Sequence, residues 1–365
     1  MSVDPVDHFS SAYAPARERF LRAAERRGGT LWSYPIGARG PHGEELAVDD
    51  AQVGPGDPES MLVVSSGLHG VEGFAGSAIQ HQLLTTQLES LDLPRDTGVL
   101  LLHGLNPHGF AWVRRVNESN VDLNRNFLRH PDEHVPSADY DRLYAAINPA
   151  ALDDDAEQAS RKAFGAFVAE HGMRRLQEVL TSGQYYHPRG MQFGGVTEEA
   201  SNRIVRRIVR QHVRGRRVAW VDIHTGLGSY GDYLMLTALG AEEGGARRGR
   251  AWYGDAVGII SDGDAVTPTC NGSADLGLLG EFAAECSPTF FVQEFGTYDI
   301  TRVFRAVRAD NWLQFHGDAD TEQGRAIKRE LLEAFRPADA VWQRSILAGG
   351  ARVLQQARDG LATAC

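Results

Sequence analysis

The sequence predicts an α/β fold, with a mixed, mostly parallel central sheet flanked by helices on both faces. Short apolar runs of strand length recur along the chain and alternate with longer stretches of helical periodicity, which is typical of a sheet built with helical crossovers. Some runs are apolar throughout, such as MLVVSS (61–66), and this indicates strands buried on both faces. A chain of 365 residues with 42% hydrophobic residues can bury a large core. We therefore expect one domain over residues 1–365.

The predicted elements begin with an amphipathic helix over residues 7–27, which Gly28 and Gly29 end. Two strand-like runs follow this helix, TLWSYPIG and EELAVDDAQVG. The sheet is then expected to continue through residues 61–66, 98–103, 217–225, 232–238 and 289–295.

Two mostly helical regions accompany this sheet pattern. One is an insertion at about 128–215, and the other is a C-terminal region at about 301–358. Within the insertion, the segment 197–213 predicts a helix whose arginines face out and whose apolar stripe consists of Ile204, Val205, Ile208 and Val209. The C-terminal region contains no motif that carries chemistry.

Composition limits the partners and the compartment. The formal charge of −11, without a Lys/Arg-rich run interleaved with aromatic residues, argues against a nucleic-acid partner. No run approaches the roughly 20 apolar residues that span a bilayer, so no membrane partner is expected. The segment MSVDPVDHFSSAY lacks the basic and apolar parts of a signal peptide. The three cysteines, Cys270, Cys286 and Cys365, are odd in number and unlike a disulfide framework, which favours a cytoplasmic protein.

A His-x-x-Glu pair follows the apolar run 61–66. The pattern occurs three times in the chain, and the matches that begin at His42 and His130 lie in Pro- and Gly-containing stretches typical of exposed loops. Only His69 and Glu72 stand between a predicted strand and a predicted helix. This places both side chains at the carboxyl end of a buried strand, where open α/β sheets bind ligands.

Two more polar side chains stand near the ends of predicted strands. His224 closes RVAWVDIHT (217–225), and Glu294 lies in the aromatic-rich TFFVQEFGT (289–297). A buried carboxylate requires a metal, another cation or a proton held at raised pKa. A catalytic zinc site uses three nitrogen or oxygen ligands and keeps a fourth position open for water. His69, Glu72 and His224 can supply those three ligands.

The segments LHGVEG, RVNESNVDLNRNF, DIHTG and QEFGT resemble, in content and order, the zinc carboxypeptidase superfamily. The resemblance implies a zinc carboxypeptidase-like fold and one bound Zn²⁺ ion. Its ligands would be His69, Glu72 and His224, and Glu294 would be the general base for attack by the zinc-bound water.

The same resemblance assigns roles to the second segment. Arg115 matches the arginine that stabilises the oxyanion, while Asn124 and Arg125 match the pair that holds a substrate's terminal carboxylate. Asp122 stands where the superfamily places a carboxylate behind the first histidine ligand. The expected substrate is a small molecule or peptide with a free carboxylate, since a planar guanidinium pairs with a carboxylate through two parallel hydrogen bonds.

Some positions depart from the digestive carboxypeptidases. His108 stands where NPDG is usual, and no equivalent of the mobile tyrosine is found. Thr225 and Gly226 after His224 make the chain similar to the aspartoacylase and succinylglutamate desuccinylase relatives, and QEFGT resembles a carboxypeptidase-like bacterial branch. The sequence therefore predicts zinc-dependent hydrolysis of an amide bond near a free carboxylate. A peptide trimmed at its carboxyl end and an N-acyl amino acid both fit.

Two other functions are compatible with parts of the sequence. GLGSYG (Gly226–Gly231) matches a dinucleotide signature and would indicate an NAD(P)-binding oxidoreductase, provided that a helix starts at these glycines. The residues that follow, GDYLMLTAL, have the pattern of a strand instead. A catalytically silent zinc- or peptide-binding relative is the second alternative, and the presence of Glu294 and Arg115 argues against it.

Overall fold

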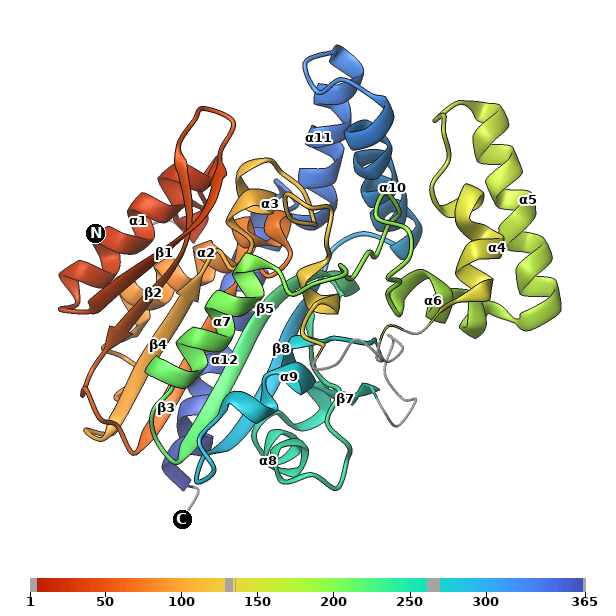
Figure 1. Ribbon diagram of the computed structural model, residues 1–365. Helices are drawn as coiled ribbons and strands as arrows, with labels where there is room; N and C mark the ends of the chain where they lie inside the picture. The colour runs from red at the N-terminus through yellow and green to blue at the C-terminus, as the bar shows by residue number, and fades with distance from the viewer. Residues whose placement is uncertain (1–4, 129–133, 135, 261–269, 364–365) are drawn as a thin grey trace.

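The computed structural model describes residues 5–128, 134, 136–260 and 270–363. It contains the predicted α/β fold, with an eight-stranded sheet in the order β1-β2-β4-β3-β5-β8-β6-β7 (Figure 1). The strands of the described residues are β1 (Thr30–Arg39), β2 (Glu45–Val53), β3 (Ser60–Ser66), β4 (Thr97–His103), β5 (Arg217–Tyr230), β6 (Tyr233–Thr237), β7 (Val257–Ile259) and β8 (Ser287–Gly296).

The centre of the sheet is parallel, because β4, β3, β5 and β8 run in the same direction. Strands β1 and β2 extend it on one side through antiparallel pairing. On the other side β6 pairs antiparallel with β8, and the three-residue β7 closes the sheet. The edge strand β1 has a register irregularity between Pro35 and Arg39. The prediction of a mixed, mostly parallel sheet is confirmed.

Helices cover both faces of the sheet, as predicted (Figure 1). Helices α1, α2, α8 and α12 bury one face, and α7 with α9 covers the other. The α-helices of the described residues are α1 (Tyr13–Arg26), α2 (Gly73–Gln82), α3 (Pro107–Ala111), α4 (Ala138–Ile147), α5 (Asp154–His171), α6 (Met173–Thr181), α7 (Ala200–His212), α8 (Gly244–Tyr253), α9 (Ala274–Gly277), α10 (Ile300–His316), α11 (Glu322–Phe335) and α12 (Ala340–Thr363).

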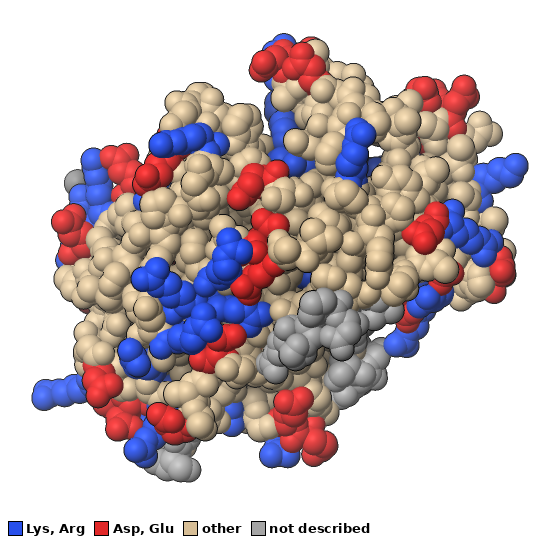
Figure 2. Space-filling model, viewed as in Figure 1, with Lys and Arg blue, Asp and Glu red and all other residues tan. Residues whose placement is uncertain are grey.

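Helix α7 has the amphipathic character that its sequence predicts. Val205, Ile208 and Val209 are buried in the core cluster under the sheet, and Ile204 packs against it half-buried. Arg203, Arg207 and Arg210 are exposed, and Figure 2 shows blue side chains gathered over this helix. The prediction that the arginines face out is wrong for Arg206, which is buried and forms ion pairs with Glu198 and Glu281. The apolar stripe therefore attaches the predicted insertion to the sheet.

The remaining helices of the insertion form a separate layer. Helices α4, α5 and α6 share their own apolar cluster, against which Phe304 and Val307 of α10 pack. In Figure 1 these helices stand beside α10. Helices α10 to α12 lie in the region predicted to be helical, and none of the described helices is long and apolar enough to cross a membrane.

Two element predictions need correction. The first α-helix begins at Tyr13 rather than at residue 7, because residues 5–8 form a separate 3-10 turn. Strand β7 was not predicted, since three residues carry too little periodicity to be recognised.

The burial of side chains in the core leads to a prediction about stability that denaturation can test. Phe291 of β8 is fully buried and contacts Tyr253 of α8, so Phe291→Ala should lower the free energy of unfolding by about 3–5 kcal/mol. Val341 is 65% exposed, and Val341→Ala should change it by less than about 0.5 kcal/mol. Equal effects of the two substitutions in urea titrations would contradict this description of the core.

Candidate metal centre

The first candidate ligands lie in a tight loop after β3. Gly67 adopts a positive φ of 73°, and the chain then forms a single 3-10 turn, η2 (Gly70–Glu72), before α2. A Cβ atom on Gly70 would stand 2.0 Å from the carbonyl carbon of Gly109, so only glycine fits there. The loop is thus pressed against α3, and this fixes the positions of His69 and Glu72.

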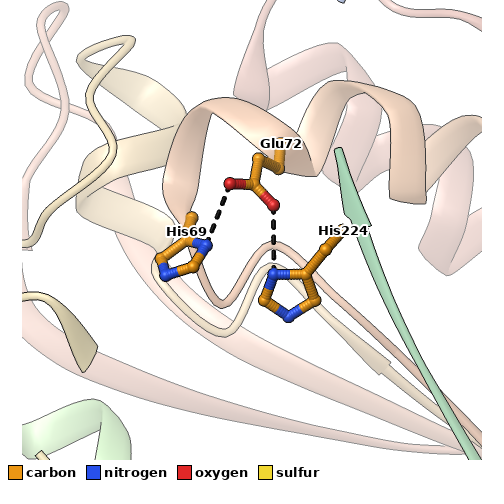
Figure 3. A group of neighbouring side chains, drawn as sticks. All are labelled: His69, Glu72 and His224. Atoms are coloured by element: carbon orange, nitrogen blue, oxygen red, sulfur yellow. Dashed lines mark ion pairs between the residues drawn. The ribbon is translucent and has the colours of Figure 1, made fainter. Parts of the chain in front are cut away.

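His69, Glu72 and His224 come together as predicted (Figure 3). Their ligand atoms all lie within 4.8 Å of one another, and all three side chains are buried. His69 Nδ1 is 2.9 Å from one oxygen of Glu72, and His224 Nδ1 is 3.1 Å from the other oxygen. The carboxylate therefore faces both imidazoles.

The hydrogen bonds behind this group suit a metal ion. His224 Nε2 lies 2.8 Å from Asp222 Oδ2, and His69 Nε2 lies 3.1 Å from Asp122 Oδ1. When the Nε2–H of His224 donates a hydrogen bond to Asp222, the Nδ1 of a neutral imidazole keeps a lone pair facing Glu72. Apart from this 2.9 Å contact with Glu72, the buried Nδ1 of His69 has no polar partner among the described residues. Two imidazole nitrogens and a carboxylate are the donor set of zinc hydrolases, so the residues fit this ion.

The electrostatics of the group favour positive charge. Burial would lower the pKa of His224, but the charge of Asp222 and hydrogen bonds to Asp222 and Glu72 hold it well above its usual value. Burial would raise the pKa of Glu72, yet His69 and His224 lower it. A proton or a metal cation among these atoms is therefore stabilised.

Glu294 lies beside His224 on the neighbouring strand, where the parallel register of β5 and β8 pairs the two residues. Its side chain is buried, and Oε1 accepts a hydrogen bond of 3.0 Å from the backbone N–H of Leu227. Burial, followed by the charge of Glu72, raises the pKa of Glu294 to about 7. This carboxyl can exchange a proton near neutral pH.

Arg115 contacts the candidate ligands directly. Its Nη1 donates to Glu72 Oε1 at 3.1 Å, its Nη2 is 2.8 Å from His69 Nε2, and its Nε donates to Asp122 Oδ2 at 3.3 Å. Burial alone would raise the pKa of Asp122, but His69, Arg115 and Arg125 hold it well below its usual range. A fixed guanidinium thus stands next to the group.

Arg125 and Asn124 make other contacts. Arg125 is buried, and its Nε and Nη2 donate to the carbonyl oxygen of Thr181, at the end of α6, at 2.9 and 2.6 Å. Its Nη1 donates to the Asn124 carbonyl at 3.0 Å. Asn124 Oδ1 accepts the N–H of Ala274 at 2.9 Å. The structure therefore anchors this pair to α6 and α9, and it does not join either side chain to the His-Glu-His group by a hydrogen bond among the described residues.

The other candidates from the sequence do not belong to the metal centre among the described residues. His42 is exposed in a turn between β1 and β2, and His130 lies outside the described residues. Residues 226–230 extend β5, and β6 follows, so the helix required by the dinucleotide signature does not start at these glycines. Asp222 was not predicted as a site residue, although its spacing of two from His224 puts both side chains on one face of a strand.

Comparisons with known proteins agree with this architecture. Residues 9–349 match the family described as "Protein of unknown function (DUF2817)". The chain belongs to this family. A search of the curated proteins finds no match.

Solved structures show the carboxypeptidase-like fold. Bovine thrombin-activatable fibrinolysis inhibitor, solved in complex with tick carboxypeptidase inhibitor, is 10% identical, with 98% of each chain covered and a TM-score of 0.52. Carboxypeptidase A from Helicoverpa armigera is 15% identical, covering 92% of this chain and 73% of its own, with a TM-score of 0.43. A Shewanella frigidimarina protein provisionally named succinylglutamate desuccinylase/aspartoacylase is 16% identical, covering 79% and 72%, with a TM-score of 0.38. The predicted resemblance to the zinc carboxypeptidase superfamily is confirmed for the fold.

The Asp222–His224 contact predicts a change in metal affinity. Asp222→Asn should weaken zinc binding by about 10–100-fold, because the carboxylate orients the imidazole and increases its basicity. Competition with a chromogenic chelator measures this. Asp50 pairs with His212 at 2.7 Å outside the group, so Asp50→Asn is a matched control that should bind zinc as the wild type does. Equal affinities for all three proteins would contradict the assignment.

The raised pKa of Glu294 predicts a pH dependence of stability for the metal-free protein. The folded-state pKa of Glu294, about 7, exceeds the unfolded value of 4.5. The contribution of Glu294 to the free energy of unfolding is therefore fully present below pH 4.5 and is lost as pH rises through 7. Because glutamine does not ionise, Glu294→Gln removes this pH-dependent loss of stability. Its melting temperature relative to the wild type should therefore be higher at pH 8 than at pH 5. A difference that does not change with pH would show that Glu294 titrates normally.

Proposed function

We propose that this protein is a zinc-dependent hydrolase that cleaves an amide bond near a free carboxylate. The observation that carries the proposal is the convergence of His69, Glu72 and His224 beside a buried carboxyl of raised pKa, Glu294, and a fixed cation, Arg115. These are the parts that amide hydrolysis requires: a metal site, a base and a charge stabiliser.

His69, Glu72 and His224 would hold one zinc ion. When bound, zinc lowers the pKa of a water molecule toward about 7 and polarises a carbonyl oxygen. Asp122 and Asp222 would keep the two imidazoles oriented, because each carboxylate lies within hydrogen-bond distance of an Nε2 atom.

Glu294 would be the general base. The N–H of Leu227 binds Oε1, which leaves Oε2 to accept the proton of the attacking water. The protonated carboxyl would then donate this proton to the leaving amine. A base with a pKa near the working pH both holds and releases a proton readily.

Arg115 would stabilise the negative charge that develops on the carbonyl oxygen. Its contacts with Glu72 and Asp122 fix the guanidinium before the substrate binds, so little reorganisation is needed during reaction. Loss of one such stabiliser typically costs on the order of a hundredfold or more in rate.

Arg125 and Asn124 would recognise the free carboxylate of the substrate. Carbonyl oxygens of Thr181 and Asn124 use three of the five N–H groups of Arg125, and this fixes the plane of its guanidinium. The remaining N–H groups can pair with a carboxylate. Peptides and N-acyl amino acids both present an amide near a carboxylate, so both are substrate classes of this proposal.

A competition screen tests the proposal. Zinc-loaded protein is incubated with a mixture of peptides and N-acyl amino acids, each paired with its carboxamide analogue, and products are identified by mass. We expect hydrolysis of members with a free carboxylate and loss of activity after chelation that zinc restores. Turnover that survives complete zinc removal would refute the metal mechanism, and equal hydrolysis of the carboxamides would refute the carboxylate recognition.

The base assignment has its own test. Glu294→Gln should bind zinc normally and lose at least about a hundredfold in kcat, because the amide cannot accept the proton. Glu281, which pairs with Arg206 and Arg210 away from the site, offers a matched control, and Glu281→Gln should retain kcat. Full activity of the Glu294→Gln enzyme would show that Glu294 is not the general base.

A further inference from the structure

The hairpin of α10 and α11 packs behind both ligand-bearing segments. Val71, which stands between His69 and Glu72, is fully buried in a cluster formed by Val303, Ala306, Leu331, Ala334 and Phe335 of these two helices. Thr225, next to His224, donates its hydroxyl to the carbonyl oxygen of Phe335 at 2.7 Å. The hairpin therefore supports the candidate metal site, although its sequence contains no recognised motif.

A buried charged triad joins this hairpin to the segment that carries Arg115. Asp310 of α10 accepts Arg114 Nε at 3.0 Å on one oxygen and Lys328 Nζ of α11 at 2.6 Å on the other. Asp310 and Arg114 are nearly inaccessible to solvent, at 4% and 2% exposure. Removing one member of such a buried group leaves an uncompensated charge, so the contact strongly constrains its partners.

The triad holds a main-chain segment in an unfavourable conformation. Val113 has a φ of 50°, which is sterically costly for a β-branched residue and persists only when its surroundings enforce it. Lys328 Nζ also donates to the carbonyl oxygen of Val113 at 3.2 Å. Lys328 and Arg114 thus attach residues 113–114 to Asp310.

The same segment bonds to the metal loop through its backbone. The carbonyl oxygen of Arg114 accepts the N–H of Val71 at 2.8 Å, and that of Arg115 accepts the N–H of Gly70 at 3.1 Å. A displacement of the segment would therefore move both the loop between the ligands and the guanidinium of Arg115.

We propose that Asp310, by joining Arg114 to Lys328, is a positioning residue for Arg115 and for the loop that carries His69 and Glu72. It acts through the segment 113–115 and contacts neither the three candidate ligands nor Arg115 by hydrogen bond or ion pair among the described residues. The kinetic consequence rests on the proposed function, because a misplacement of about 1 Å in a catalytic group can cost a hundredfold in rate. The structural consequence does not depend on it.

Two variants and one control separate positioning from general stability. Asp310→Asn keeps the shape of the side chain and removes its charge. Lys328→Met removes the ammonium from a side chain that is 23% exposed, against 5% for Asp310. We therefore expect Lys328→Met to destabilise the fold less than Asp310→Asn does. The control is Glu330→Gln, since Glu330 forms a 2.6 Å ion pair with Arg302 across the same two helices on the exposed side.

Hydrogen exchange of the metal-free proteins is the first measurement. The amides of Gly70 and Val71 should exchange at least about tenfold faster in Asp310→Asn and Lys328→Met, while strand β5 stays protected. Glu330→Gln should match the wild type. Unchanged exchange at Gly70 and Val71 in both variants would overturn the proposal, as would faster exchange spread equally over β5.

Kinetics of the zinc-loaded proteins, with a substrate from the competition screen, are the second measurement. Asp310→Asn should lower kcat at least about tenfold with little change in KM, because Arg115 acts mainly in the transition state. In an Arg115→Met background the same substitution should lower kcat by a smaller factor than in the wild type, because the part of its effect that passes through the Arg115 guanidinium is already lost. Fully additive losses would overturn the positioning of Arg115. If the wild type hydrolyses nothing, the proposed function fails, and the exchange result still decides whether Asp310 positions the loop.

Discussion

Nδ1 of His69, the carboxylate of Glu72 and Nδ1 of His224 face one another, all on buried side chains, and lone pairs so close together repel unless positive charge lies among them. The surroundings are arranged for such a charge. Asp122 and Asp222 stand behind the imidazoles, and the guanidinium of Arg115 lies at the rim. The fold holds these groups close together, and the chemistry we propose depends on that.

The sheet makes the arrangement possible. Parallel register pairs Ser66 of β3 with Ile223 of β5, and it pairs His224 of β5 with Glu294 of β8. Side chains from three distant parts of the chain therefore meet at the carboxyl ends of neighbouring strands. Helices outside the sheet then hold parts of the site in place. The end of α6 accepts hydrogen bonds from Arg125, and the α10–α11 hairpin packs against the loop that carries His69 and Glu72.

The sequence was sufficient where the signal is local. Apolar runs ending in polar residues predicted β3, β5 and β8, because strand burial and strand ends are properties of short segments. The convergence of His69, Glu72 and His224 was predicted from the combination of four segments and their resemblance to the zinc carboxypeptidase superfamily. The contacts of Asp310 and the engagement of Arg125 by Thr181 could not be predicted in this way. A single aspartate in a helix has no distinguishing pattern, and its partner Arg114 lies almost two hundred residues earlier. Such contacts are set by how helices pack, which periodicity does not specify.

The two ends of the sheet have a consequence for the behaviour of the protein in concentrated solution. One border strand is only three residues long, and the other is interrupted between Pro35 and Arg39. The short border therefore offers few regularly spaced amide and carbonyl groups to a foreign polypeptide, and the irregularity in the other border shortens its regular part to Thr30–Pro35, which limits β-mediated self-association. A wide, apolar sheet is thereby given borders that disfavour edge-to-edge pairing with another strand.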